Sequence, residues 1–134
     1  LITKTLPQGN GFSYTYDDAS CASSEKRCTQ NVKSITQFAP SGSGLAPLTR
    51  SFTYESAYNK VATETDARGN ATTYTYAPWG DIATVTSPVD ASGVAPWTAY
   101  DYYSWTPTGF PTMYLLWKTT VKTSASNSTA TTRT

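Results

Sequence analysis

A glycine turn followed by alternating threonine and tyrosine occurs twice in this sequence, at an offset of 60 residues. The stretch DARGNATTYTY, from Asp66 to Tyr76, aligns without a gap with LPQGNGFSYTY, from Leu6 to Tyr16. A looser copy, SGVAPWTAYDY, ends at Tyr102, and Phe52-Thr53-Tyr54 has the same aromatic spacing without the glycine turn. An internal repeat constrains the fold strongly, because every copy adopts the same local structure and packs against its neighbours.

Each copy reads as a β-hairpin. Residues two apart in a strand share a face, so Tyr74 and Tyr76 point one way and Thr73 and Thr75 the other. After each aromatic strand come a turn and a second alternating strand, such as IATVT after Tyr76. One such hairpin is too small to bury its own face, and pairing with neighbours is needed for stability. The sequence therefore predicts an all-β fold, an antiparallel array of about four stacked hairpin units.

The units start near residues 14, 52, 74 and 100 of a single domain that spans residues 1–134. Loop insertions are expected at 19–29, which holds the two cysteines, and at 39–50, where glycine, proline and serine interrupt any strand. The Ser/Thr-rich end, from Ser124 to Thr134, reads as a polar strand or as a low-complexity tail, and its alignment with the repeat favours the strand. The aromatic residues expected in the core between units are Tyr14, Tyr16, Phe52, Tyr54, Tyr74, Tyr76, Tyr100 and Tyr102. The residues expected in the tight turns are Gly9, Asn10, Gly69, Asn70, Gly80 and Gly93.

Two cysteines, Cys21 and Cys28, lie in a polar segment. Their spacing is not that of a CxxC redox pair, and the sequence has no histidine to complete a zinc site. A disulfide that closes the tip of a hairpin is the expected arrangement. It favours an oxidising, extracytoplasmic setting.

Residues suited to catalysis are scarce. Without histidine the usual general base is missing, and the nine acidic residues fall mostly in or beside turns. We therefore expect no enzyme activity, no catalytic residue, no metal and no cofactor. The formal net charge of +1 gives no basic surface for nucleic acid, and no apolar run is long enough for a membrane span.

Sugar binding is a further hypothesis from the aromatic residues. Exposed indole rings beside polar groups can stack on sugars, and Trp79, Trp97 and Trp105 lie at or near turns and strand ends. Trp79, between Pro78 and Gly80, is expected at a hairpin tip. These three residues form the predicted sugar platform, and glycans are the corresponding partner.

The repeat resembles the YD or Rhs repeat, in which a glycine turn, Asn-x-Thr-Thr-Tyr-x-Tyr, a second turn and a hydrophobic-Thr-x-Thr strand follow one another. TDARGNATTYTY, from Thr65 to Tyr76, carries the closest match, and the resemblance extends loosely from Thr5 to Thr134. The Tyr-Asp that names the repeat is present at Tyr16 and Tyr100, whereas Tyr76 is followed by alanine.

The resemblance implies a bacterial secreted or cell-surface protein whose repeats form the wall of a shell around a C-terminal effector. On that interpretation the sequence is an internal segment of the wall, and its partners are flanking repeats of the same polypeptide. A second hypothesis is an extracellular fibre subunit that polymerises with identical copies by strand addition. A carbohydrate-binding surface module is the third.

Overall fold

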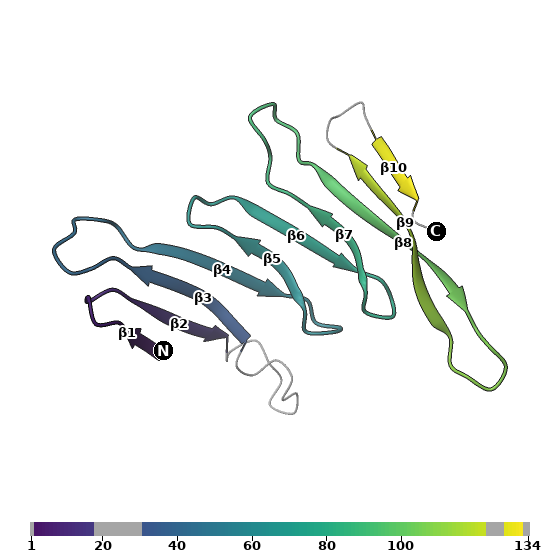
Figure 1. Cartoon of the computed structure of the whole chain (residues 1–134), viewed down its shortest axis with the longest axis horizontal. Helices are drawn as coiled ribbons and strands as arrows, with labels where there is room; N and C mark the ends of the chain where they lie inside the picture. Colours follow the sequence, from purple (N-terminus) through teal and green to yellow (C-terminus); the bar gives the residue numbers. More distant parts are fainter. Residues whose placement is uncertain (1, 18–30, 123–127, 133–134) are drawn as a thin grey trace. The chain divides into compact units, whose positions relative to one another are not determined.

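The computed structural model describes residues 2–17, 31–122 and 128–132 of the 134-residue chain (Figure 1). All the regular structure in these residues is antiparallel β-strand, as the alternating sequence predicts. The chain divides into two compact units, Leu1–Ala71 and Thr72–Thr134. None of the described residues belongs to a helix with the length and hydrophobicity needed to cross a membrane.

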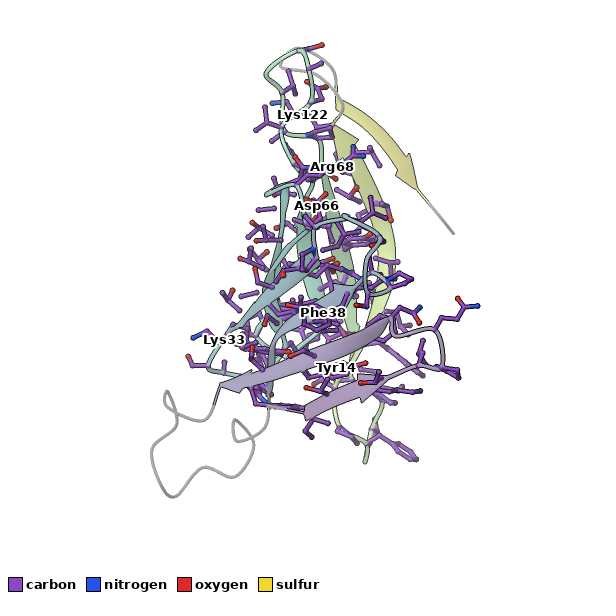
Figure 2. All side chains as sticks on the ribbon, turned by 90° about the vertical axis from the view of Figure 1, so that its left-hand side faces the viewer. Tyr14, Lys33, Phe38, Asp66, Arg68 and Lys122 are labelled. Atoms are coloured by element: carbon purple, nitrogen blue, oxygen red, sulfur yellow. The ribbon has the colours of Figure 1, made fainter. Side chains whose placement is uncertain are left out.

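The first unit contains five strands in chain order. They are β1 (Ile2–Thr5), β2 (Gly11–Asp17), β3 (Asn31–Phe38), β4 (Leu48–Tyr54) and β5 (Val61–Thr65). Each of them pairs antiparallel with the next, so every contact between strands is a contact between sequence neighbours. Tyr14 lies on β2, beside the strand that carries Lys33 and Phe38 (Figure 2).

The second unit repeats this arrangement. Its strands are β6 (Ala71–Tyr76), which begins at the unit boundary, β7 (Ile82–Thr86), β8 (Trp97–Trp105), β9 (Met113–Lys122) and β10 (Ser128–Thr132). Again each strand pairs antiparallel with the next one. β10 confirms that the Ser/Thr-rich end contains a strand. β8 and β9 form the longest hairpin, with nine paired positions.

Four of the turns share one five-residue structure with glycine in fourth place. They are Leu6–Asn10, Asp66–Asn70, Ala77–Asp81 and Asp90–Val94. In each, the N–H of the first residue donates to the carbonyl of the last, and the glycine N–H donates back to the carbonyl of the first. The glycine φ angles lie between 77° and 97°, a left-handed region in which a Cβ is costly. The predicted turn glycines Gly9, Gly69, Gly80 and Gly93 all occupy this fourth place.

An aspartate reinforces two of these turns. The Asp66 carboxylate accepts hydrogen bonds from the backbone N–H of Arg68, at 2.8 Å, and of Asn70, at 2.9 Å, and from the Asn70 side chain. Asp90 accepts the two corresponding backbone bonds, from Ser92 and Val94. The bonds from the Asn70 side chain and backbone hold the pKa of Asp66 below its usual value. Asn70, which the sequence places in a turn, is thus part of its hydrogen-bond network.

The loop that follows β3 is shorter than the sequence suggests. Residues 48–50 were expected in an insertion that ends at residue 50, yet they form the start of β4. Leu48, Thr49 and Arg50 pair with Gln37, Thr36 and Ile35 of β3. Pairing with β3, which alternation in this short stretch does not indicate, extends the strand back to Leu48.

The strands have two chemically different faces. Thr15, Ser34 and equivalent residues form the hydroxyl face, on which threonine and serine meet across strands; the tyrosines and their aliphatic partners form the aromatic face. Hydroxyl pairs join Thr15 to Ser34 at 2.6 Å, Thr36 to Thr49 at 2.9 Å and Thr75 to Thr84 at 2.6 Å. Among the described hydrophobic side chains, Ala77 alone is buried, with 7% of its surface exposed. The hairpins of each unit therefore lie side by side without a closed core.

Candidate functional site

The same β-bulge interrupts all four hairpins. In β2–β3, β4–β5, β6–β7 and β8–β9 the register shifts directly before the second aromatic residue of the first strand. These second aromatic residues are Tyr16, Tyr54, Tyr76 and Tyr102, and they pair with Val32, Val61, Ile82 and Leu116 respectively. At each shift, one residue of the second strand has no partner on the first strand. Such a bulge bends the strand and increases its local twist.

The bulge has a consequence for the neighbouring hairpin. The ladder between β3 and β4 ends at Ser34 and Ser51, and does not reach Val32. The Tyr54 hydroxyl donates to the Val32 carbonyl instead, at 2.9 Å. The second unit repeats the arrangement: the β7–β8 ladder ends at Thr84, and the hydroxyl of Tyr102 donates to the Ile82 carbonyl, also at 2.9 Å.

We term this arrangement the tyrosine lock: the second tyrosine of one hairpin donates to the bulge carbonyl of the preceding hairpin. It supplies a hydrogen bond to a carbonyl that lies beyond the end of the ladder between the two hairpins. It also favours the observed register between the hairpins, because a shifted strand would move the hydroxyl away from that carbonyl. Partial burial raises the pKa of Tyr54 and of Tyr102. The negative charge of Asp81 raises the pKa of Tyr102 further. Both phenols are protonated at neutral pH and can donate a hydrogen bond.

A signal for the lock was present in the sequence. The second aromatic position is tyrosine in all four hairpins, whereas the first position accepts phenylalanine at Phe52. Ring packing alone does not require a hydroxyl, so an unvarying tyrosine indicates a hydrogen bond. Periodicity reasoning missed it because alternation assigns both aromatic positions to one face without distinguishing them.

The eight aromatic residues predicted in the core are half-buried. They lie on the first strands of the four hairpins, with Tyr14, Phe52, Tyr74 and Tyr100 two residues before the lock positions. Each ring is covered from the sides by neighbouring strands, and none belongs to the fully buried class. Arg50 lies over the ring of Phe52 and forms an ion pair with Glu64 on the adjacent strand.

The three tryptophans of the predicted sugar platform lie in different surroundings. Trp79 stacks on Tyr114, with ring centroids 3.8 Å apart and an interplanar angle of 2°, and meets Tyr102 edge to face. Trp97 and Trp105 begin and end β8, which separates them by about 26 Å of strand. The three rings do not form one continuous surface. Glycan binding by any single one of them stays a prediction.

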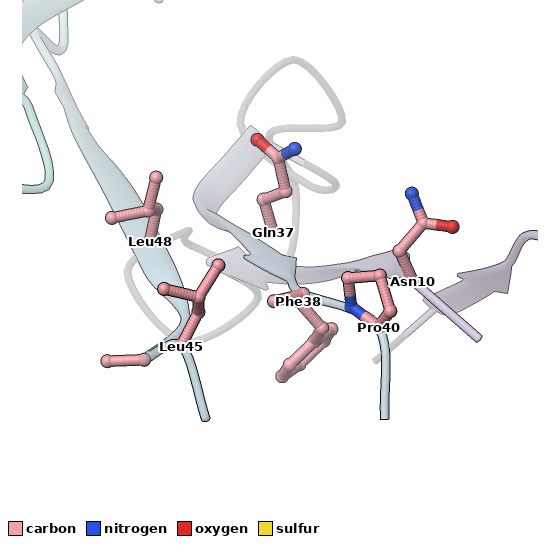
Figure 3. A pocket seen from close by; sticks show the side chains of 8 residues that line it. Asn10, Gln37, Phe38, Pro40, Leu45 and Leu48 are labelled. Carbon is pink, nitrogen blue, oxygen red and sulfur yellow. The ribbon is translucent and has the colours of Figure 1, made fainter. Parts of the chain in front are cut away.

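Three pockets among the described residues differ in charge, and the smallest of them, of about 430 Å³, is lined by Arg50, Asp66 and Arg68. One, of about 520 Å³, lies at the β3–β4 connection (Figure 3). Its labelled lining residues are Asn10, Gln37, Phe38, Pro40, Leu45 and Leu48, which supply apolar surface and two amides but no charged group. A second, of about 640 Å³, lies beside Trp79 and contains Asp101 and Lys118, which face each other in the β8–β9 register.

The acidic residues with shifted pKa values serve turns. Glu55 accepts backbone hydrogen bonds from Ala57, Tyr58 and Lys60 after the end of β4. These bonds and the charge of Lys60 lower the pKa of Glu55, although desolvation acts in the opposite direction. Asp66 has the corresponding role in the next turn. Within the described ranges no three acidic or cysteine side chains gather as metal ligands would.

Cys21 and Cys28 lie outside the described residues, and their disulfide stays a prediction. Comparison with known proteins adds no identity: no family model, curated protein or solved structure matches the chain. The function is therefore argued from the repeat geometry alone.

Proposed function

We propose that the chain is a non-enzymatic structural segment, part of the wall of a secreted or cell-surface bacterial protein of the Rhs/YD-repeat kind. In the intact protein the wall encloses a C-terminal effector, and the partners of this segment are flanking repeats of the same polypeptide. The observation that carries the proposal is the tyrosine lock, which recurs between β3 and β4 and between β7 and β8.

A device of this kind is useful in an extended array. Backbone ladders specify that neighbouring strands pair, but alternating sequences with similar residues allow register slips. A side-chain bond to a bulge carbonyl favours one register at the two junctions where it is present, β3–β4 and β7–β8. The same bulge in all four hairpins bends and twists the strands of each of them locally.

The described chemistry also fits a structural role. The carboxylates whose pKa values are shifted hold turns together, and half-buried tyrosines spread over the aromatic face instead of converging on one point. An active site places titratable groups within hydrogen-bond reach of each other and of a substrate. Glu55 and Asp66 bond to their own turns.

Light scattering combined with negative-stain imaging of the purified 134-residue chain tests the proposal. A wall segment separated from its flanking repeats gives monomers or shapeless particles, because its edges lack their natural partners. Regular filaments of uniform width would replace the proposal by the second hypothesis, an extracellular fibre subunit that grows by strand addition.

A further inference from the structure

The outer part of the β8–β9 hairpin departs from the rest of the repeat. We define the arm as residues 102–117, which include the end of β8, the turn and most of β9. β7 pairs with β8 from Trp97 to Ala99, and β10 pairs with β9 from Lys118 to Lys122. Beyond these positions the two strands of the second unit pair with each other only (Figure 1).

Exposed hydrophobic side chains concentrate on this arm. Eight of the fifteen large exposed hydrophobic residues in the described chain fall between residues 103 and 117. They are Tyr103, Trp105, Phe110, Met113, Tyr114, Leu115, Leu116 and Trp117. Phe110, in the turn, is 69% exposed. The arm contains no Asp, Glu, Lys or Arg, whereas Asp101 and Lys118 face each other directly at its base.

The hydroxyl face changes character along the arm. In the other hairpins this face carries threonine and serine pairs such as Thr75 and Thr84. In the arm, the corresponding pairs are Tyr103 with Leu115 and Trp105 with Met113. The aromatic face carries Tyr114, which Trp79 partly covers, and Leu116, which is 45% exposed, so apolar surface is exposed on both faces of the arm. A lipid layer can contact the exposed side chains of both faces at once.

The order of side chains along the arm also matches a lipid surface. Among the rings of the hydroxyl face and the turn, Tyr103 lies nearest the charged base, Trp105 is farther out and Phe110 is in the turn, so the rings of this face become less polar toward the tip. Tyrosine and tryptophan prefer the headgroup level of a bilayer, and lysines such as Lys118 and Lys122 prefer its aqueous side. From the Asp101–Lys118 pair to the Trp105–Met113 pair the strands rise about 13 Å, enough for the outer part to reach the acyl boundary.

We propose that the arm is a membrane-contacting hairpin that enters the interfacial layer of a lipid bilayer with Phe110, Trp105 and Met113 deepest. Its backbone limits the depth. The outward N–H and C=O groups of a two-stranded hairpin need water or headgroups as partners, so the arm lies in the interface and does not span the hydrocarbon. The proposal is independent of the structural role proposed above.

Flotation of the purified chain with phosphatidylcholine–phosphatidylglycerol vesicles tests the inference. The chain should float with the vesicles, and brominated lipids should quench its tryptophan fluorescence. Phe110→Ser and Leu115→Ser should each weaken vesicle binding roughly tenfold, because each removes one large side chain from the apolar layer. The matched controls are Leu45→Ser and Val89→Ser, which change equally exposed residues, at 71% and 64%, outside the arm and should bind as the parent does.

Three outcomes overturn the inference. The first is the absence of vesicle binding by a chain whose circular dichroism shows intact β-structure, and the second is an equal loss of binding in the arm and control variants. The third is found without lipid: if light scattering shows an oligomer that Phe110→Ser and Leu115→Ser dissociate, the arm binds a second copy of the chain. Circular dichroism of every variant separates these outcomes from misfolding, and the exposure of Phe110 makes a folding defect at that site unexpected.

Discussion

The tyrosine lock predicts different results for two substitutions on the same strand. Tyr102→Phe removes the hydroxyl that donates to the Ile82 carbonyl and leaves the ring in place. Tyr100→Phe removes a hydroxyl two residues earlier, on the same face of β8, which makes no corresponding bond to a carbonyl. The first position already accepts phenylalanine at Phe52, so Tyr100→Phe is a matched control of identical chemistry.

The expected cost follows from the bond and its surroundings. A net hydrogen bond contributes about 0.5–1.5 kcal/mol, and a carbonyl left without a partner costs up to about 3 kcal/mol when it is fully buried. Tyr102 is only half-buried, so water reaches the freed Ile82 carbonyl and the cost falls near 1 kcal/mol. For a unit of roughly 60–100 residues, that amount lowers Tm by about 4–8 °C.

Urea unfolding of the full chain, followed by far-UV circular dichroism, measures the effect in both units. Tyr102→Phe should lower the urea midpoint without changing the dependence of the unfolding free energy on urea concentration. Tyr54→Phe should have the same effect, because it removes the hydroxyl that donates to the Val32 carbonyl. The two locks belong to different units. The free energy of unfolding lost in the double variant should therefore equal the sum of the losses in the two single variants. Equal midpoints for Tyr100→Phe and Tyr102→Phe would refute the reasoning, since the lock would then contribute nothing beyond the ring.

Other features of the chain give four further predictions. Gly69→Ala should cost ~1 kcal/mol in a denaturation midpoint because its φ is 85°, and Gly69→Asn should cost less, since asparagine tolerates that region. Gly11→Ala should release β1, because the new Cβ would collide with the Lys4 carbonyl oxygen; hydrogen exchange at Ile2–Thr5 should then accelerate selectively. The lowered pKa of Asp66 stabilises its turn above the unfolded-state pKa, so amide protection at Asn70 should fall as the pH drops below about 4, and Asp66→Asn should flatten that dependence. If Cys21 and Cys28 form a disulfide, alkylation of the denatured protein should raise its mass only after reduction; alkylation without reductant would contradict the pairing.

The sequence was sufficient for the strands and most turns. Alternation in IATVT predicted β7, and the GN dipeptides located the turns before β2 and β6. These features follow from local rules, since side-chain period and glycine conformation act over a few residues. The end of the β3–β4 loop was misplaced because Thr-Arg-Ser is compatible with either loop or strand until pairing with β3 is known.

The bulge was beyond prediction for a different reason, and so was the carbonyl to which the lock tyrosine donates. A bulge is a relation between two strands, and the four passed-over residues, Lys33, Ala62, Ala83 and Trp117, belong to three different residue types. The depth of burial also depends on what lies above a sheet, which no strand specifies by itself. The predicted tyrosine core is therefore present as half-buried rings on one face.

Pairing of each strand with its nearest neighbour in sequence has a consequence for how the chain acquires its structure. A hairpin closes over a short loop in about 1–10 μs, and no strand within either unit waits for a distant segment to arrive. Such low contact order favours fast folding. A polypeptide that leaves a cell as an extended thread, one end first, can then fold hairpin by hairpin as it emerges, with each finished hairpin serving as the template for the next.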